Sequence, residues 1–404
     1  MQPFNETWLT SPLHIVDASV GAPSTMLPDL GERYRHEAEE ELALDPAQIL
    51  VSMLLPIGDT LFATPALGAL RRRFPLAKIS VLVSRSNAGI LEDNPSFDHL
   101  VVVDEPRSEH AEHKMVRFAR GLSELRTTKY DLVINFSPVG ALVLRMAGIY
   151  QRPLRVHMPL LWWLVGTHSS DYRSRHAIDH YINAIAPILD APLAEEERQP
   201  RMYLTARNRT AARKLLREWG LSPADTLITM HVGGEGFNGR KQWAPKRFAQ
   251  VAAELIERFG AHVLLIGGKQ DLPLCEQVAE QLGNHATVAA GRTSLKETAA
   301  LIEVSALFIG NDSCPLHIAA GVGTPAVGIF GPSNHVQFRP VGKKAYRQRI
   351  VHSNLPCAPC FHFVGSEAPW VPNTCHSFAC LKAITAEHVL DAAVELLEDA
   401  REEG

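Results

Sequence analysis

The amino-acid sequence predicts an α/β protein made of two doubly wound domains that face a cleft. The chain has 404 residues, which suits two domains of ordinary size. Short apolar runs rich in β-branched residues alternate with helical segments in both halves of the chain. This alternation is typical of βαβ units and a parallel sheet. The two halves are similar in kind, so we expect two domains rather than one large sheet.

The first domain is predicted over residues 47–205, after an N-terminal extension over residues 1–46 that contains a charged helical segment at 31–44. Its elements are predicted from apolar periodicity and from Gly and Pro breaks. The expected strands cover 49–55, 78–84, 100–103 and 130–135, and the expected helices cover 60–74, 118–126 and 176–189.

A charged, proline-bearing stretch near residues 195–200 suggests the domain boundary, and the second domain is predicted over 206–385. A Cys-rich segment at 356–381 lies inside it, and a C-terminal helix occupies 386–404. The expected strands are 227–231, 262–267, 287–289, 307–309 and 326–330, and the expected helices are 245–259, 273–282, 295–304 and 386–402.

Composition restricts the classes of function. The formal net charge is −4, which argues against a broad nucleic-acid-binding surface. The N-terminus has no basic and apolar signal-peptide pattern, and no apolar run is long enough to span a bilayer. We therefore expect a cytoplasmic protein whose six cysteines are thiols or metal ligands rather than disulfides. Contact with the inner membrane stays open, because Arg71–Arg73 and the pair Trp162 and Trp163 suit a lipid surface as well as they suit a solvated helix end and a core.

The most informative stretch is residues 306–320. An apolar run is expected to end at Gly310, a polar turn follows, and a helix begins with Ser313 as its N-cap and Pro315 in its first turn. A helix N-terminus at the carboxyl end of a strand presents free backbone N–H groups, which bind phosphates. Asp312 lies in the expected turn and His317 lies one helical turn further on.

Four segments, taken in order, resemble glycosyltransferase family 9, the ADP-heptose:lipopolysaccharide heptosyltransferases. They are residues 55–75, 130–134, 176–181 and 310–333. The resemblance covers roughly residues 48–395. It implies a GT-B architecture, in which two Rossmann-like doubly wound domains face a cleft. It also implies inverting transfer from a nucleotide-diphosphate sugar without a catalytic metal.

The resemblance assigns catalytic roles to Asp59 and Lys241. Asp59 would be the general base that takes the proton of the acceptor hydroxyl, and the alternative is a helix N-cap. Lys241, in a glycine-rich stretch, would stabilise the leaving diphosphate, and Arg240 could share that role. Gly233 and Gly234 fall where the family binds phosphates through the backbone.

The remaining donor contacts are predicted in the second domain. Asp312 would bind hydroxyls of the donor sugar, and the N–H groups of Ser313 and Cys314 would bind the diphosphate, with His317 in the same motif. Cys314 stands where the family usually has glycine. Asp271 is the candidate for the ribose hydroxyls, and helix capping is the alternative.

Four cysteines form a candidate metal site. Cys357 and Cys360 have the tight C-x2-C spacing of a metal knuckle, and Cys375 and Cys380 are more loosely spaced. The sequence suggests structural zinc or iron on these thiolates, with four reduced thiols or one disulfide as the alternative. The resemblance adds a precedent, because a subgroup that heptosylates proteins holds iron on four cysteines.

The predicted function is that of an inverting heptosyltransferase with ADP-heptose as donor and a lipopolysaccharide core sugar as acceptor. Two alternatives stay open: transfer to a protein or small-molecule acceptor, and a catalytically silent glycosyltransferase-like scaffold. The expected partners are a nucleotide-diphosphate sugar and a lipid-linked saccharide or protein acceptor, without nucleic acid. A nicotinamide enzyme is discarded, because no Gly-x-Gly-x-x-Gly follows a strand.

Overall fold

The computed structural model describes residues 14–17, 45–104, 111–149, 154–157, 174–222, 224–234, 240–342, 344–360, 375 and 377–402. These residues divide into two units. The N-terminal unit holds the described residues from 45 to 157 together with Ala177–Tyr203. The C-terminal unit holds the strand at residues 14–17, residues 174–176 and everything described from Leu204 onward.

The N-terminal unit is built on a five-stranded sheet in the order β4-β3-β2-β5-β6, and every neighbouring pair is parallel. The chain starts in the middle of the sheet, moves outward to one edge and then returns to the other side of β2. Ligands bind at such a reversal of strand order, at the carboxyl ends of the strands. The strands are β2 (Gln48–Met53), β3 (Lys78–Ser84), β4 (His99–Val103), β5 (Leu132–Asn135) and β6 (Leu154–His157).

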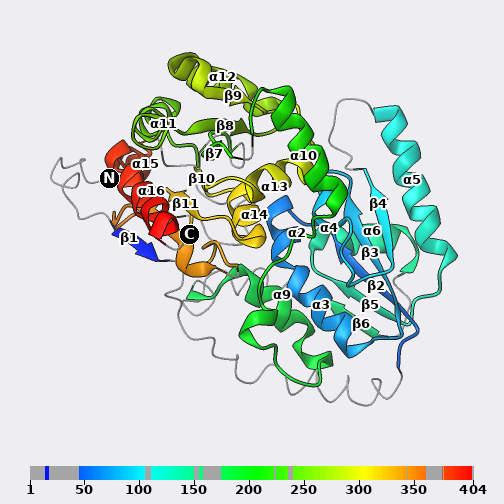
Figure 1. Ribbon diagram of the computed structural model, residues 1–404. Helices are drawn as coiled ribbons and strands as arrows, with labels where there is room; N and C mark the ends of the chain where they lie inside the picture. Colours follow the sequence, from blue (N-terminus) through cyan, green and yellow to red (C-terminus); the bar gives the residue numbers. More distant parts are fainter. Residues whose placement is uncertain are drawn as a thin grey trace. The chain divides into compact units, whose positions relative to one another are not determined.

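Helices cover this sheet because its strands are apolar on both faces. Side chains of α5 and α6 share one buried cluster with β2, β3, β4 and β5. Helix α9 contacts both α2 and α3 (Figure 1). The helices are α2 (Ile57–Phe62), α3 (Thr64–Arg73), α4 (Ala88–Leu91), α5 (Ala111–Thr127), α6 (Pro138–Met146) and α9 (Ala177–Ile185), with short 3-10 turns at Ala186–Ile188 and Glu195–Glu197.

The C-terminal unit has a seven-stranded sheet in the order β1-β12-β11-β10-β7-β8-β9. All neighbouring strands in it are parallel except β1, which pairs antiparallel with β12. The strands are β1 (His14–Asp17), β7 (Leu227–His231), β8 (His262–Ile266), β9 (Ala286–Val288), β10 (Leu307–Asn311), β11 (Ala326–Phe330) and β12 (Gln348–His352).

Two buried clusters occupy the two faces of this second sheet. Alternate residues of β7 separate them: Ile228 packs with α11, α12, α15 and α16, whereas Leu227 packs with α10 and α13 (Figure 1). The helices are α10 (Ala206–Glu218), α11 (Pro245–Phe259), α12 (Leu272–Leu282), α13 (Leu295–Glu303), α14 (Cys314–Val322), α15 (Ala379–Ala383) and α16 (Ala386–Glu402), with 3-10 turns at Lys269–Asp271, Gly283–His285 and Ala345–Arg347.

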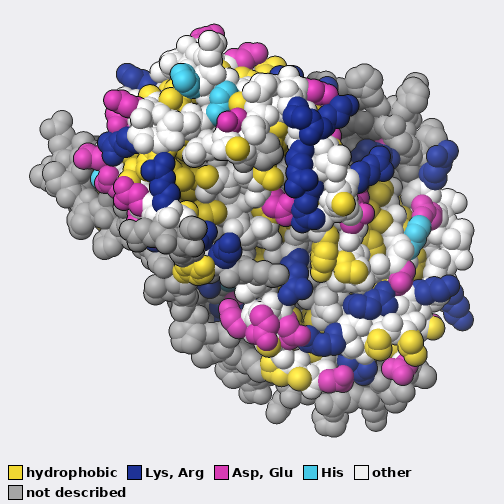
Figure 2. Space-filling model, viewed as in Figure 1, with side chains coloured by type: hydrophobic (Ala, Val, Ile, Leu, Met, Phe, Trp, Pro, Cys, Tyr) yellow, Lys and Arg dark blue, Asp and Glu magenta, His cyan; other side chains and the backbone are white. Residues whose placement is uncertain are grey.

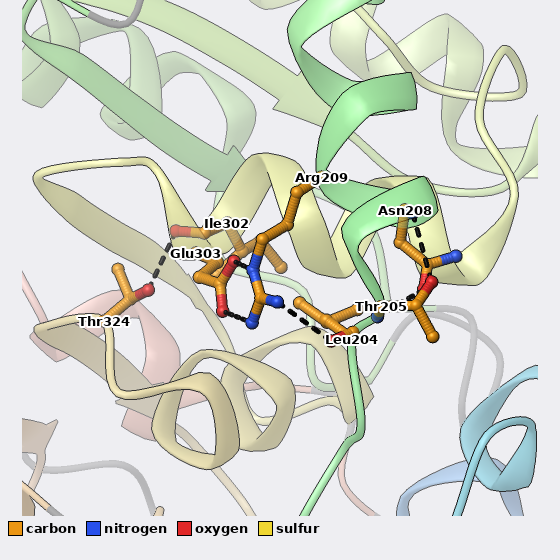
Figure 3. A network of polar contacts seen from close by, with 7 residues as sticks. All are labelled: Leu204, Thr205, Asn208, Arg209, Ile302, Glu303 and Thr324. Atoms are coloured by element: carbon orange, nitrogen blue, oxygen red, sulfur yellow. Dashed lines mark hydrogen bonds and ion pairs between the residues drawn. The ribbon is translucent and has the colours of Figure 1, made fainter.

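Helix α10 is fastened to α13 by polar contacts as well as by apolar packing (Figure 3). The Arg209 guanidinium makes two hydrogen bonds, of 2.7 and 2.8 Å, to the two carboxylate oxygens of Glu303 in α13. Thr205 and Asn208 form a reciprocal capping box at the start of α10. These contacts fix the first helix of the C-terminal unit against its sheet.

The structure differs from the sequence-based expectation at several elements. The helix expected over 60–74 is two helices that meet at Ala63, because Pro65 has no N–H to continue the first one. The expected strand 307–309 continues to Asn311, so Gly310 and Asn311 are strand residues rather than part of a turn. Seven helices and strands of the described residues were not predicted: β1, β6, β12, α4, α6, α10 and α15.

Both ends of the chain contribute to the C-terminal unit. The extension expected over residues 1–46 contains β1, which adds an outer strand beside β12. The helical segment expected at 31–44 lies outside the described residues. The last helix, α16, is not a separate appendage, since Val389, Ala393 and Leu396 belong to the main buried cluster of the unit.

No helix in the described part of the chain is long and apolar enough to cross a membrane. On the face drawn in Figure 2, Lys and Arg side chains line the outer surface of α10, while acidic and basic side chains are interspersed elsewhere. The exposed basic residues of α10 are Arg207, Arg213, Lys214 and Arg217.

Candidate functional site

The carboxyl end of β10 leads directly into the N-terminus of α14. Ser313 is the N-cap of this helix and Pro315 lies in its first turn, as the sequence predicts. The Ser313 hydroxyl does not cap the helix, because it lies 2.9 Å from Nδ1 of His231 and 3.1 Å from the carbonyl oxygen of Asn311. The first N–H groups of α14 are therefore not satisfied by this side chain, which suits a site for an anion.

Asp312, at the same strand end, is enclosed by two cationic or polarisable side chains. One carboxylate oxygen accepts a 2.6 Å hydrogen bond from Nζ of Lys241, and the other lies 3.6 Å from Nε2 of His317. Burial alone would raise the pKa of Asp312, but the charges of Lys241 and His317 and their hydrogen bonds hold it well below its ordinary value. The carboxylate is thus ionised and already paired.

The segment that carries Lys241 is held in place by Asn311, a residue that sequence reasoning assigned only to a turn. The fully buried Asn311 amide donates to the carbonyl oxygens of Val232 and Gly233, at 3.0 and 2.8 Å. Its side-chain oxygen accepts a 3.0 Å hydrogen bond from the backbone N–H of Trp243. One side chain therefore ties both ends of the glycine-rich segment to β10. The signal in the sequence is an amide residue directly before the aspartate of the motif.

Trp243 attaches the same segment to the hydrophobic core of the C-terminal unit. Its indole is fully buried, Nε1 donates to the carbonyl oxygen of Ile384 at 2.9 Å, and the ring packs edge-on against Phe248 at 5.0 Å. Because Lys241 lies two residues before this buried tryptophan, the backbone near the lysine is held by the core. Residues 235–239 of the segment lie outside the described part of the chain.

Asp271 lies beneath the glycine-rich segment, in the 3-10 turn that follows β8. It is buried, accepts a 2.8 Å hydrogen bond from the N–H of Gly268, and lies 3.6 Å from Nε2 of His231. A Cβ atom at Gly233 would come within 1.9 Å of Oδ1 of Asp271, so only glycine allows this close approach. Burial opposes ionisation, but His231 and nearby backbone N–H groups hold the pKa of Asp271 below its ordinary value.

Three further predicted donor residues lie around this site. Gly234 has a φ of 138°, a backbone conformation that side chains rarely adopt. Cys314 is buried in the first turn of α14 and carries a reduced thiol. Arg240 is half-buried, and its charge partly offsets the burial and neighbouring thiols that raise the pKa of Cys360.

In the N-terminal unit, Asp59 lies in the first turn of α2, after the carboxyl end of β2. The N-cap of this helix is Pro56, so the expectation that Asp59 precedes a helix and could cap it is wrong. Its Oδ1 accepts a 2.9 Å hydrogen bond from the phenol of Tyr181. Tyr181, in α9, is buried and packs edge-on against Phe136 with ring centres 5.4 Å apart. The structure thus adds Tyr181 as a partner of the predicted base.

The four C-terminal cysteines influence one another. Cys380 is buried in α15, and burial together with the other three thiols raises its pKa to about 12. Burial and the neighbouring thiols Cys375 and Cys357 also raise the pKa of Cys360. Among the described residues, no group of three or more His, Cys, Asp or Glu side chains has an arrangement that could hold a metal ion.

These features define the class of protein. Two α/β units on parallel sheets, each with an aspartate after the carboxyl end of a central strand, form a glycosyltransferase of GT-B architecture. The chain belongs to glycosyltransferase family 9, since the model described as "Glycosyltransferase family 9 (heptosyltransferase)" matches residues 117–371. The predictions of the family, the fold class and a glycosyltransferase enzyme are confirmed.

Individual proteins show the same relationship. Lipopolysaccharide heptosyltransferase 3 of Escherichia coli is 28% identical over 291 residues, which cover 70% of this chain and 83% of that protein. The crystal structure of a family 9 glycosyltransferase from Veillonella parvula is similar with a TM-score of 0.69 and 27% identity, over 87% of this chain and 98% of that one. The E. coli ADP-heptose heptosyltransferase II shares the fold, with a TM-score of 0.67 and 21% identity over 88% of this chain and 100% of that one.

Proposed function

We propose that this protein transfers heptose from ADP-heptose to a hydroxyl of a lipopolysaccharide core saccharide, with inversion and without a catalytic metal. The observation that carries the proposal is the Lys241–Asp312 pair beside the N-terminus of α14. It supplies a cation and backbone N–H groups for a diphosphate, and a carboxylate for sugar hydroxyls. The E. coli relative named lipopolysaccharide heptosyltransferase 3 supports the choice of sugar and acceptor.

The reaction requires one base and one site for the leaving group. Asp59 takes the proton from the acceptor hydroxyl while the oxygen forms a bond to the anomeric carbon. The bond from that carbon to the diphosphate oxygen breaks, and the electron pair leaves with the nucleotide diphosphate. Tyr181 holds the Asp59 carboxylate through its 2.9 Å hydrogen bond. Lys241 and the N–H groups of Ser313 and Cys314 stabilise the charge that gathers on the diphosphate.

Lys241 has to serve two anions in this scheme. Without donor it pairs with Asp312 at 2.6 Å, which keeps the buried carboxylate ionised. The diphosphate adds a second negative partner for the same ammonium group, and Asp312 then accepts hydrogen bonds from sugar hydroxyls. Asp271, Gly233 and Gly234 would hold the ribose and phosphates, and His317 would support Asp312 from its far side.

A donor screen tests the proposed function. Purified protein is incubated separately with ADP-heptose, UDP-sugars and GDP-sugars, with and without a cell-envelope extract, and released nucleotide diphosphate is measured. We expect release from ADP-heptose that depends on the extract. Release that requires a protein fraction of the extract would instead support a protein acceptor. Failure of every nucleotide sugar to bind would support the silent scaffold, which the presence of Asp59, Lys241 and Asp312 disfavours.

We also propose that Cys357, Cys360, Cys375 and Cys380 hold one structural zinc or iron ion. The neighbouring thiols raise the pKa of Cys360 and Cys380, and a bound cation would favour the thiolates that burial disfavours. The four side chains do not have a coordinating arrangement in the described structure, so metal binding would have to bring them together. Elemental analysis of freshly purified protein is expected to find about one metal ion per chain, and the Cys357→Ser, Cys360→Ser double variant should lose it. Metal-free protein that is fully folded and active would contradict the site.

Contact with the cytoplasmic face of the inner membrane is proposed through helix α6. Val139, Leu142 and Met146 recur at helical spacing and are 59%, 60% and 48% exposed, with the exposed Arg145 beside them. Such a stripe suits the interface of an anionic membrane. Co-sedimentation with anionic vesicles should weaken for Leu142→Glu and stay unchanged for Leu76→Glu, since Leu76 is exposed outside this stripe.

A further inference from the structure

His231, the last residue of β7, lies between two groups assigned to the donor site. Its Nδ1 is 2.9 Å from the hydroxyl oxygen of Ser313, and its Nε2 is 3.6 Å from a carboxylate oxygen of Asp271. The imidazole is buried, with a side-chain exposure of 6%. A carboxylate, an imidazole and a hydroxyl therefore form one continuous chain under the N-terminus of α14.

The protonation of His231 decides what the Ser313 hydroxyl can do. With one proton, placed on Nε2 beside Asp271, the imidazole presents a lone pair at Nδ1. The single hydroxyl proton of Ser313 then points inward, because its neighbours on that side, Nδ1 and the Asn311 carbonyl oxygen, are both acceptors. With a proton on both nitrogens, Nδ1 donates to Ser313 and the hydroxyl proton is released from that bond.

An anion at the helix N-terminus needs donors, so it favours the second state. A hydroxyl that turns its lone pairs toward a phosphate repels it, whereas one that turns its proton outward adds a charge-assisted hydrogen bond. The negative charge of the diphosphate also stabilises an imidazolium one hydroxyl away. Asp271, which is held ionised, balances the positive charge from the opposite side.

Among the described residues, the charged side chain beside the His231 imidazole is Asp271. The neighbouring strands contribute Ile266 and Gly310 at the same register, and neither is ionisable. On the α14 side, the Asp312 carboxylate is paired with the Lys241 ammonium group, and His317 lies 3.6 Å from its other oxygen. The groups that contact the imidazole are thus the Asp271 carboxylate and the Ser313 hydroxyl.

We propose that His231 is a positioning residue for the donor diphosphate, and that donor binding draws a proton onto its imidazole, which turns the Ser313 hydroxyl toward the phosphate. This inference rests on the proposed function, because it places the diphosphate of a nucleotide sugar at the N-terminus of α14. It makes nucleotide-sugar affinity depend on pH through one identified group. No covalent step is involved, and the proton comes from solvent.

Calorimetry with ADP-heptose tests the proposal. Both phosphates of this ligand are esterified, so the ligand itself takes up no proton near neutrality. Binding is measured at one pH in HEPES and in Tris, whose ionisation enthalpies differ, and then across about two pH units. We expect the binding enthalpy to differ between the buffers in the direction of proton uptake, and affinity to fall by up to about tenfold per pH unit as pH rises.

We call the proposed effect of His231 protonation on the Ser313 hydroxyl the relay. Variants show whether the pH dependence passes through this relay or comes from the general electrostatic field of the site. His231→Gln keeps a polar side chain that cannot titrate, and it should remove both the buffer dependence and the pH dependence. Ser313→Ala should remove them as well, because the hydroxyl transmits the effect. The matched control is His262→Gln. His262 is the first residue of β8, at the end of the strand away from the site, and its imidazole contacts Thr287. This variant should leave proton uptake unchanged.

Each result supports or overturns the proposal. Equal enthalpies in both buffers for the wild-type protein would overturn the relay and leave the proposed function intact, and this result does not depend on any variant folding. Proton uptake that persists in His231→Gln or in Ser313→Ala would also overturn it. Failure of ADP-heptose to bind in any buffer would overturn both the relay and the proposed function.

Discussion

Asp59 and Asp312 occupy equivalent places in two different α/β units, yet their surroundings differ. Each follows the carboxyl end of a central parallel strand and lies at the start of a helix. Asp312 is 4% exposed and is paired with the ammonium group of Lys241, which holds its pKa well below the ordinary range. Asp59 is half-buried, and one of its hydrogen bonds is donated by the phenol of Tyr181.

The comparison indicates which carboxylate can act as the base. A carboxylate beside a fixed cation is a poor proton acceptor, because protonation would leave the cation unpaired in a buried site. Asp59 is less buried than Asp312 and accepts a hydrogen bond from a phenol, so we favour it as the base. In the proposed function, the same strand-to-helix motif supplies a base in one unit and a ligand-binding group in the other.

The largest expected effect is that of Asp59→Asn. The amide keeps the shape of the side chain but cannot accept the proton of the acceptor, so turnover should fall by about 10³-fold. Binding of ADP-heptose should not change, since this carboxylate belongs to the acceptor step. Single-turnover kinetics and calorimetry measure the two quantities. Undiminished transfer would reverse the assignment of the two aspartates.

Lys241→Ala should have the next largest effect, because it leaves Asp312 buried without its cation. We expect a loss of about 3 kcal/mol in the free energy of unfolding and a decrease of about 10²-fold in kcat/KM. Urea unfolding and steady-state kinetics with ADP-heptose measure these changes. Lys246→Ala, at an exposed lysine in the first turn of α11, is the control.

The same variant changes the response to acid. The folded-state pKa of Asp312 is lower than its unfolded value, so its contribution to stability is present above about pH 4 and is lost as pH falls through that value toward the folded pKa. Lys241→Ala removes the largest cause that lowers this pKa. Its unfolding free energy should therefore depend less steeply on pH below about pH 5. Equal slopes in the two proteins would show that Lys241 does not set the ionisation of Asp312.

Asn311→Asp should weaken ADP-heptose binding by about tenfold, because the carboxylate cannot donate to the carbonyl groups of Val232 and Gly233. The glycine-rich segment would lose its tie to β10. Asn87→Asp is the matched control: Asn87 in the other unit is also buried and donates to the carbonyl of Leu55. Both variants should lose stability, but only Asn311→Asp should lose donor affinity. Equal affinities would make Asn311 a purely structural residue.

The smallest effect is expected for Tyr181→Phe. Loss of the phenol removes the 2.9 Å hydrogen bond to Asp59 and leaves the buried ring in place. The ionised carboxylate loses a stabilising partner, so the acidic limb of the rate profile should move to higher pH, and kcat at neutral pH should fall about threefold. The profile distinguishes this role from a packing role, which would lower the rate at all pH values alike.

Much of the fold could be predicted because its elements carry strong local signals. The strands at Lys78–Ser84, Leu227–His231 and Ala326–Phe330 have the predicted bounds, as do the helices Pro245–Phe259 and Ala386–Glu402. These runs are long and strongly periodic or consist of continuous apolar residues between Gly and Pro breaks. Strand β12 was missed because Gln348–His352 has only two apolar residues between polar ones, and its burial depends on strands β11 and β1 on either side of it.

The sequence by itself determined the family, the succession of strands and helices and the start of α14, since these depend on residues that are neighbours in the chain. Only the tertiary structure decided which of the site residues meet. Lys241 lies 71 positions before Asp312, and His231 lies 82 positions before Ser313. Their contacts exist because parallel strands β7, β8 and β10 bring their carboxyl ends to one edge of the sheet. Local propensity carries no information about such pairings, because they depend on the order of strands in the sheet and on the burial that follows from it.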